Sequence, residues 1–251
     1  HVLAQAVGAG VLDDGAGFVA ISDGGAVASG RFVRTDGLIS GIVLDRFPPL
    51  TGPDAQPLRR AESDSEGLAL DQDGGFYVSF EWTPGVRRFG GAGKADGPLM
   101  TIPEFTEFQD NAALEALAIG PDGALYTMPE RSGLATLPFP VFRLLNGEWD
   151  QPFTIPRTGP YLVSGADIGP DGKFYVLERD FVGIGFRSRV RRFAMDGTQE
   201  EILLVTPVLR HDNLEGISVW DDGEGLRMTL ISDDNFRRFQ RTEFVEYRLT
   251  D

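Results

Sequence analysis

Acidic residues recur in this chain at two positions, each defined by its distance from an Asp-Gly dipeptide. The dipeptides begin at Asp14, Asp73, Asp122, Asp171 and Asp222. The first acidic position stands just before the apolar run that leads into the turn, and it holds Glu66, Glu115 and Glu215, with Val7 and Ser164 in the other copies. The second stands at the end of the apolar run after the turn, and it holds Asp23, Glu81, Glu130 and Asp233, with Glu178 aligned after an offset of one residue.

The two acidic positions meet if each Asp-Gly dipeptide is the turn of a hairpin. The beginning of the first strand and the end of the second then lie at the same end of the hairpin, so copies around an axis bring both sets to one face. Carboxylates a few ångströms apart raise one another's pKa unless a cation neutralises them. Oxygen ligands without Cys suit a hard cation. The alternative is that these acids only cap strand ends, as the turn aspartates do.

The sequence therefore predicts a divalent-cation site with Ca²⁺ as the expected ion and Mg²⁺ as the alternative. Its predicted ligands are Glu66, Glu115, Glu215, Asp23, Glu81, Glu130 and Asp233. Four arginines are predicted beside these acids, where they would hold a phosphate or carboxylate group of a substrate. They are Arg59, Arg60, Arg131 and Arg179. Ion pairing with the excess of acid is the alternative role for them.

Three residues are candidates for a catalytic role as general base. Glu115 and Glu215 belong to the first acidic set, and His211 is the only histidine after His1. Imidazole is the side chain whose ordinary pKa lies near neutrality. A plain loop position is the alternative for His211. The chain has no Gly-x-Ser-x-Gly elbow, Walker loop or dinucleotide fingerprint, so other common chemistries have no motif here.

The spacing of the turns predicts the fold. The intervals between the five turn aspartates are 59, 49, 49 and 51 residues. A period of about 40–50 residues with strand-turn-strand content is typical of a propeller blade, and Asp-Gly between apolar runs is a hairpin signal. We expect one all-β domain, a five-bladed β-propeller with repeats at about 1–50, 60–105, 112–157, 161–207 and 212–251. Six blades, or unrelated hairpins in a sandwich, are the alternatives.

Four segments carry further expectations. The fifth repeat lacks a fourth strand, so we expect His1–Ala6 to complete it, or residues before His1 to have been removed. The Pro-rich stretch 137–140 is expected to be a loop in the third repeat. The stretch 179–186 is expected to be a long loop, either a lid over the channel or a packed corner. In the second repeat, Leu99–Ile102 is expected to be the outermost strand.

Composition and charge argue against several kinds of partner, membrane segment and catalytic group. The 251 residues include 23 Lys and Arg against 38 Asp and Glu, a net charge of −15 that disfavours nucleic acid. No apolar run is long enough to span a membrane. Cysteine is absent, which excludes disulfides, thiolate nucleophiles and zinc-cysteine sites. We take a monomer as the default and a small anionic or ester substrate as the expected partner.

Several motifs resemble one known family over nearly the whole chain. They are Glu66–Leu70 with Val78–Glu81, Glu115–Ala118, Phe174–Arg179, and Asp212–Ile217 followed by Ile231–Phe236. They look like the phytase-like domain family, described as "esterase-like activity of phytase". The resemblance implies a bacterial, periplasmic or secreted β-propeller that hydrolyses phosphoesters or esters. Calcium-dependent propeller phytases are rich in lysine at their phosphate site, whereas this chain has only Lys94 and Lys173, which argues against phytate as the substrate.

Three functions follow as hypotheses. The first is a metal-dependent hydrolase of phosphoesters or esters, in which the metal activates water and the arginines orient the anion. The second is a non-enzymatic propeller that binds a small ligand or a protein and uses the cation for structure. The third is a calcium-dependent lactonase of the gluconolactonase kind.

Overall fold

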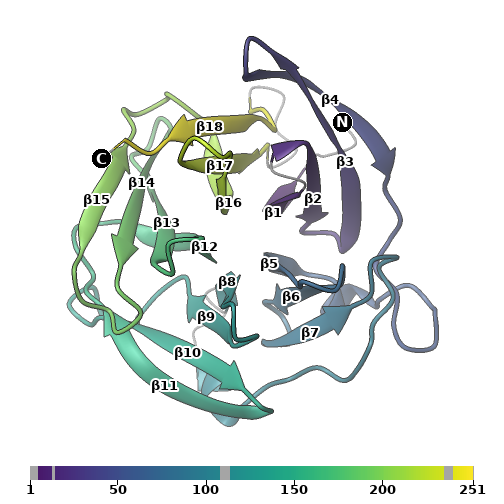
Figure 1. Cartoon of the computed structure of the whole chain (residues 1–251). Coiled ribbons are helices and arrows are strands. Elements are labelled where there is room, and N and C mark those ends of the chain that lie inside the picture. Colours follow the sequence, from purple (N-terminus) through teal and green to yellow (C-terminus); the bar gives the residue numbers. More distant parts are fainter. Residues whose placement is uncertain (1–4, 13–14, 108–113, 235–239, 251) are drawn as a thin grey trace.

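Five antiparallel sheets surround a central axis in the computed structural model, which describes residues 5–12, 15–107, 114–234 and 240–250 (Figure 1). Each sheet is one blade, and its first strand lies nearest the axis. This arrangement confirms the predicted five-bladed β-propeller. The described residues contain no helix that is long and apolar enough to cross a membrane.

The strands follow the chain from blade to blade. Blade 1 contains β1 (Ala6–Leu12), β2 (Gly17–Ser22), β3 (Ala26–Thr35) and β4 (Leu38–Arg46). Blade 2 contains β5 (Ser65–Leu70), β6 (Phe76–Phe80) and β7 (Gly85–Phe89). Blade 3 contains β8 (Leu114–Ile119), β9 (Leu125–Pro129), β10 (Phe139–Leu145) and β11 (Glu148–Ile155).

Blade 4 contains β12 (Leu162–Ile168), β13 (Phe174–Phe181), β14 (Phe186–Phe193) and β15 (Glu201–Val205). Blade 5 contains β16 (Asn213–Asp221), β17 (Leu226–Asp233) and β18 (Phe244–Arg248). Two short 3₁₀ helices lie in the connections between blades, η2 (Arg60–Glu62) and η3 (Pro103–Glu107).

The Asp-Gly turns join the first and second strands of the blades. Their glycines have positive φ, for example 85° at Gly74 and 79° at Gly123, which glycine adopts without steric cost. The aspartate carboxylates hold the turns: Asp73 Oδ1 accepts a hydrogen bond of 2.9 Å from the backbone N–H of Gly75. Asp122, Asp171 and Asp222 accept equivalent bonds. These turn aspartates are structural, as expected.

The expectation that segment 99–102 forms a fourth strand of blade 2 is wrong. The segment 99–102 makes a single bridge, in which the backbones of Val86 and Met100 exchange two hydrogen bonds of 2.9 and 2.8 Å. A three-stranded blade here and in blade 5 leaves both sheets narrower than the other three.

Two expected loops are partly strand. Phe139 and Pro140 begin β10 and pair with Ile155 and Thr154 of β11. The strand tolerates Pro140 because the pairing of β10 with β9 starts only at Phe142, so the missing N–H breaks no bond to β9. The stretch 179–186 is the end of a regular hairpin, in which Arg179, Asp180 and Phe181 pair with β14. It is neither a long loop nor a packed corner.

The ring closes between blades 5 and 1 through side chains. Arg34 of β3 pairs with Glu246 of β18 at 2.7 Å, and the ring of Phe244 lies 4.9 Å from that of Phe18. Val11 of β1 donates its N–H to Ser218 Oγ of β16 at 3.0 Å. The expected closing segment His1–Ala6 falls mostly outside the described residues, and Ala6 itself belongs to β1 of blade 1.

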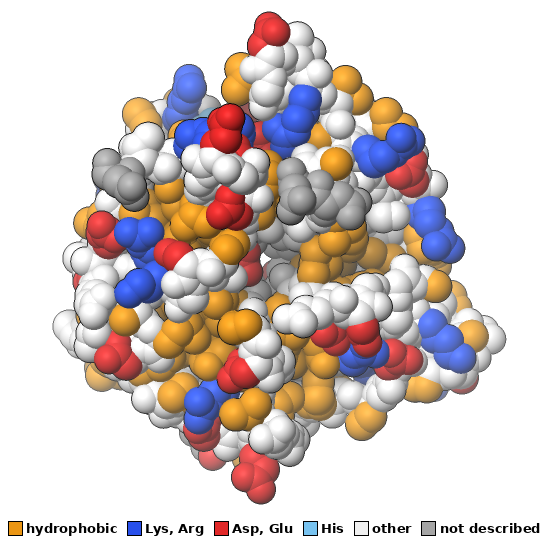
Figure 2. Space-filling model, viewed as in Figure 1, with side chains coloured by type: hydrophobic (Ala, Val, Ile, Leu, Met, Phe, Trp, Pro, Cys, Tyr) orange, Lys and Arg blue, Asp and Glu red, His pale blue; other side chains and the backbone are white. Residues whose placement is uncertain are grey.

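The apolar core lies between neighbouring blades. Phe174 and Phe153, for example, meet edge to face with centroids 5.9 Å apart, between blades 4 and 3. The face drawn in Figure 2 is hollowed at its centre, with hydrophobic side chains around the hollow and many charged side chains further out.

Candidate functional site

A β-bulge interrupts the innermost strand of every blade at the same place. The pairing of β5 with β6 shifts between Ser65 and Leu68, and the pairing of β8 with β9 shifts between Leu114 and Ala116. The same shift occurs in β1, β12 and β16. A bulge adds a residue to one strand and re-aims its side chain. The first acidic set occupies these bulges, so its residues lie inside the strands, whereas the sequence predicted them just before the strands.

The strand register also shows which residue of each blade occupies the second acidic position, at the end of the second strand. Ser22, Phe80, Pro129, Glu178 and Ser232 are the partners of the residues that precede the bulges. The residues that follow them are Asp23, Glu81, Glu130, Arg179 and Asp233. Blade 4 therefore places Arg179 where the other blades place an acid, and the alignment of Glu178 with the acidic set is wrong.

Glu178 is instead a buried structural residue. Its side chain is fully buried and accepts hydrogen bonds from Arg189 Nε at 2.7 Å and from Arg191 Nη2 at 2.6 Å. The acids of the two sets surround one mouth of the channel, and we call this ring of acids the rim. Because Arg189 and Arg191 belong to β14 of the same blade, the carboxylate of Glu178 faces the body of blade 4 rather than the rim.

Arg179 neutralises one side of the acidic rim. Its guanidinium forms ion pairs with Glu215, with Glu130 at 3.3 Å and with Glu115 at 3.8 Å, and it donates to Asn213 Oδ1 at 2.9 Å. The side chain of Arg179 is only 16% exposed, so its N–H groups donate to protein acceptors rather than to solvent. The expected role of Arg179 in holding a substrate must compete with three resident carboxylates.

Glu215 retains one unsatisfied oxygen. Its Oε1 accepts from Arg179 and from Asn213 Nδ2, whereas its buried Oε2 has no hydrogen-bond partner among the described residues. Burial raises the pKa of Glu215 to about 7, although Arg179 acts in the opposite direction. A buried orphan oxygen is costly, so it calls for a proton or a ligand.

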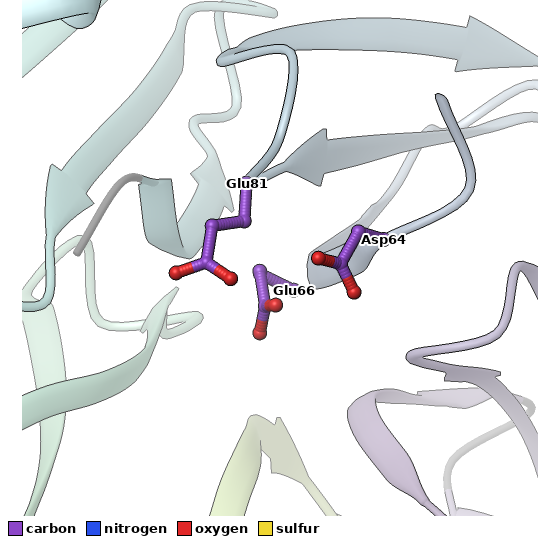
Figure 3. A group of neighbouring side chains, drawn as sticks. All are labelled: Asp64, Glu66 and Glu81. Atoms are coloured by element: carbon purple, nitrogen blue, oxygen red, sulfur yellow. The ribbon is translucent and has the colours of Figure 1, made fainter. Parts of the chain in front are cut away.

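Asp64, Glu66 and Glu81 form the other side of the rim. One oxygen from each carboxylate lies within 4.8 Å of one from each of the others, and the three side chains converge in Figure 3. Glu66 occupies the bulge of β5, Glu81 follows β6, and the N–H of Glu81 donates to the carbonyl of Asp64 at 3.1 Å. Asp64 is missing from the predicted set, although an acid two residues before a bulge position was a visible signal.

Burial raises the pKa of all three carboxyls of the triad, and like charge adds to this effect at Glu66 and Glu81. Burial raises the pKa of Glu66 well above its ordinary value, with further contributions from Glu115, Glu215, Glu81 and Asp64. Burial and then Asp64 raise the pKa of Glu81, and burial raises that of Asp64 while Arg60 lowers it. The triad is therefore strained by desolvation and like charge, which a bound cation would relieve.

The last two predicted ligands lie near the triad. Burial, then Asp233 and Asp64, raise the pKa of Asp23 to about 6, so these three carboxyls share one neighbourhood. Asp233 is buried, and the carbonyl of Asp23 accepts from the N–H of Ser65 at 3.2 Å. The structure thus gathers the predicted acids at one mouth of the channel, divided between an arginine-neutralised side and the triad.

The remaining predicted site residues are Arg131, Arg59, Arg60 and His211, and their contacts differ. Arg131 donates from Nε to Glu130 Oε2 at 2.8 Å and is half exposed. Arg59 and Arg60 are exposed, and Arg60 acts electrostatically on Asp64. His211 faces Glu243 Oε1 at 3.1 Å and Tyr247 Oη at 2.7 Å with its two ring nitrogens, rather than a rim carboxylate. The catalytic and substrate-binding roles of these residues remain predictions.

A pocket of about 390 Å³ opens beside Arg179. Its polar wall consists of Glu130, Arg131, Arg179, Asp180, Asn213 and Glu215. Its apolar wall consists of Pro160, Leu162, Phe181 and Phe186. Acids of the rim and one half-exposed arginine thus face a space large enough for a small molecule.

A second cavity, of about 570 Å³, lies at the Asp-Gly turns, at the other end of the innermost strands. Between the two ends the channel narrows to a cavity of about 10 Å³. Glycines cause this constriction: a Cβ at Gly67 would lie 2.9 Å from the backbone nitrogen of Leu117, and one at Gly165 would lie 2.5 Å from the carbonyl oxygen of Glu215. The two mouths are therefore separate sites.

Solved structures with similar folds are β-propellers. Regucalcin, a calcium-binding protein from Agrobacterium tumefaciens, has a TM-score of 0.55 at 11% identity, with 98% of this chain and 90% of that one covered. A gluconolactonase from Xanthomonas campestris has a TM-score of 0.50 at 14% identity, with 98% and 77% covered. An exo-β-1,3-galactanase from Phanerochaete chrysosporium has a TM-score of 0.57 at 12% identity, with 98% and 61% covered. These identities support a shared fold alone.

A search of the curated proteins finds no match for this chain. A family model for phytase-like proteins, described as "Esterase-like activity of phytase", matches residues 4–236. The matched range contains all five bulges, the triad and Arg179. The chain therefore belongs to the phytase-like family.

Proposed function

We propose that this protein is a divalent-cation-dependent hydrolase of esters or phosphoesters, with Ca²⁺ held by Asp64, Glu66 and Glu81. One observation carries the proposal: three carboxylates of one blade converge at the channel mouth, while Arg179 neutralises the acids opposite them. The triad is thus left with an excess of negative charge in a partly buried place. The unpartnered Oε2 of Glu215 adds a second acceptor without a donor at the same mouth.

The donor set favours Ca²⁺ over Mg²⁺. Two oxygens on opposite sides of Mg²⁺ lie about 4.2 Å apart, and on opposite sides of Ca²⁺ about 4.6 to 5.2 Å apart. The triad oxygens all lie within 4.8 Å of one another, a limit that is compatible with ligands around Ca²⁺. Ca²⁺ also accepts the higher coordination number that several carboxylates and waters provide. Such a site would suit an exported protein, because calcium sites of extracellular modules work at high calcium concentrations.

A divalent ion in such a site supplies a Lewis acid for a carbonyl or phosphoryl oxygen. Glu215 is the proposed general base, because a raised pKa of about 7 lies near the optimum for proton transfer at neutral pH. Hydrolysis forms a bond from the water oxygen to the acyl carbon or phosphorus and breaks the bond to the leaving-group oxygen. The proton that Glu215 takes from water passes to that leaving oxygen. Arg131 would orient an anionic group at the edge of the pocket.

The experiment compares hydrolysis of p-nitrophenyl phosphate, p-nitrophenyl acetate and a lactone by the purified protein after EDTA treatment and after return of Ca²⁺ or Mg²⁺. We expect at least one substrate to be cleaved, with loss in EDTA and recovery with Ca²⁺. Glu66→Gln and Glu81→Gln should lose this activity. Asp45→Asn is the matched control, because Asp45 is exposed and, among the described residues, forms its ion pair with Arg31 on the outside of blade 1. A rate of hydrolysis that EDTA treatment does not lower would contradict the proposal.

Binding without hydrolysis is the outcome that favours the non-enzymatic alternative. In that case no substrate would be cleaved, yet Ca²⁺ would raise the melting temperature, since a ligand at 100 times its Kd stabilises the folded state by about 2.7 kcal/mol. Cleavage of the lactone alone would narrow the proposal to a lactonase, because a lactone is a cyclic ester and uses the same chemistry.

A further inference from the structure

The hairpin of β13 and β14 extends further from the rim than its counterparts. Measured from equivalent residues of the register, β13 runs three residues past the ends of β2, β6 and β9. The added pairs are Arg179 with Ser188, Asp180 with Arg187 and Phe181 with Phe186. The extension therefore raises a wall at blade 4 beside the pocket that Arg179 borders.

This wall is apolar and partly exposed. Phe181 is 56% exposed and packs on Phe186 with ring centroids 5.1 Å apart. Both rings line the pocket together with Pro160 and Leu162. Exposed apolar surface of this kind is costly in water and is commonly found where a protein binds an apolar group. At the tip, Ile184 is 76% exposed and does not line the pocket.

The rest of the pocket lining carries charge. Arg131 is 49% exposed with its Nε on Glu130, so its guanidinium stands at the pocket between protein and solvent. Arg179 and Glu215, which are more buried than Arg131, also line the pocket. A ligand that fills the space must therefore present an apolar part to the phenylalanines and a polar or anionic part to Arg131 and the rim.

We propose that the substrate is amphiphilic: an ester or phosphoester with an alkyl or aryl group that lies on Phe181 and Phe186 while the scissile group faces the acidic rim. This inference rests on the proposed hydrolase function and adds the substrate class. A pocket of about 390 Å³ has room for a short chain or one ring rather than a long lipid. Each buried methylene contributes about 0.8 kcal/mol, which is about a fourfold change in affinity.

The test uses p-nitrophenyl acetate, butyrate and hexanoate with Ca²⁺ present. For the wild type we expect kcat/KM to rise with each added methylene, by up to about fourfold, until the wall is covered. Phe181→Ser should flatten this dependence, so that acetate, butyrate and hexanoate are cleaved with similar kcat/KM. Ile184→Ser is the matched control, because it removes an exposed apolar side chain of the same hairpin outside the pocket.

A binding measurement keeps this test separate from the test of hydrolysis. Calorimetry with methylphosphonate and hexylphosphonate in Ca²⁺ needs no turnover, so it gives a result even if no ester is cleaved. Tighter binding of hexylphosphonate by the wild type, lost in Phe181→Ser and kept in Ile184→Ser, supports the inference. Equal affinity for the two ligands, or binding of neither, overturns it. Equal damage by both substitutions also overturns it, because the tip rather than the pocket wall would then take the apolar group.

Discussion

Arg179 of β13 takes the position that Glu130 takes directly after β9, and the two side chains form an ion pair with Arg179 Nη2 3.3 Å from Glu130 Oε1. A five-fold repeat of acids is thereby broken by one built-in cation. Glu115, Glu130 and Glu215 form ion pairs with Arg179, whereas the triad on blade 2 forms no ion pair with any described residue. The asymmetry explains why a symmetric sequence pattern yields one candidate cation site on one side of the mouth.

Arg179→Gln should therefore destabilise the calcium-free protein. Removing one partner of a buried charge cluster typically costs about 3–5 kcal/mol, because the remaining charges stay buried without compensation. We also expect added Ca²⁺ to stabilise the variant more than the wild type, because a second ion can replace the lost guanidinium. Urea denaturation with and without Ca²⁺ measures both effects, and calorimetry gives the number of ions bound.

Arg131→Gln is the control for that substitution. Arg131 contacts the same Glu130 but is half exposed, so its loss should cost less than about 1 kcal/mol. If the Arg179→Gln variant were as stable as the wild type in EDTA, Arg179 would not be the counter-charge of the rim.

Glu178→Gln should lower stability without changing the affinity for Ca²⁺. The substitution leaves Arg189 and Arg191 buried beside an uncharged amide, and we expect a loss of about 3–5 kcal/mol in the free energy of unfolding. Asp150→Asn breaks an exposed pair with Arg143 and should cost less than about 1 kcal/mol. Urea denaturation and calcium titration of both variants check the prediction. A weaker affinity for Ca²⁺ in Glu178→Gln would place Glu178 in the rim after all.

Glu178 and Arg179, which are neighbours in the chain, also mark the limit of what the sequence could predict. The turn spacing predicts the five blades, because an Asp-Gly hairpin signal is local and repeats. Whether residue 178 or residue 179 faces the rim depends on strand register, and a shift of one residue moves a side chain to the other face. The bulge between Val163 and Gly165 sets that register, and bulges have no comparable local signal.

The same reasoning explains the other differences. The spacing of Asp64 two residues before Glu66 is visible in the sequence, but the bulge in β5, which places Glu66 beside Asp64 and Glu81, is not. The segment 99–102 has the composition of a strand but makes only one bridge to β7. The acids as a class could be predicted because repeat symmetry requires equivalent positions to share one mouth. Their division by Arg179 could not, since it depends on a contact between blades.

Asp167, which lines the cavity at the second mouth, should make the stability of the protein depend on pH. Burial raises its pKa to about 7, although the N–H groups of Ile168 and Val219 donate to its two oxygens at 2.8 and 2.6 Å. Because the folded-state pKa lies above the ordinary value, the folded protein binds this proton more tightly than the unfolded chain. Its contribution to stability is therefore greatest below about pH 4 and falls as the pH rises through about 7.

Between pH 5 and pH 8 we expect Asp167 alone to lower the free energy of unfolding by on the order of 3 kcal/mol. Asp167→Asn should reduce this slope, although it should be less stable at pH 5, because an amide has one acceptor oxygen for the two N–H donors. Asp45→Asn, on the exposed edge of blade 1, should keep the wild-type slope. Chemical denaturation at both pH values measures the change. An unchanged slope in Asp167→Asn would mean that the burial of this carboxyl has no energetic consequence.

Asp64→Asn should weaken calcium binding as strongly as Glu66→Gln. Both substitutions remove one negative charge from the triad, and ligand charge is one of the factors that set the affinity of a Ca²⁺ site, so we expect about a tenfold or larger rise in Kd. Asp23→Asn is the informative comparison, because Asp23 lies near Asp64 but outside the triad, and its removal should raise the Kd less. Titration calorimetry at neutral pH measures all three variants. A larger effect of Asp23→Asn than of Asp64→Asn would move the ion from blade 2 toward blades 1 and 5, where Asp23 and Asp233 lie.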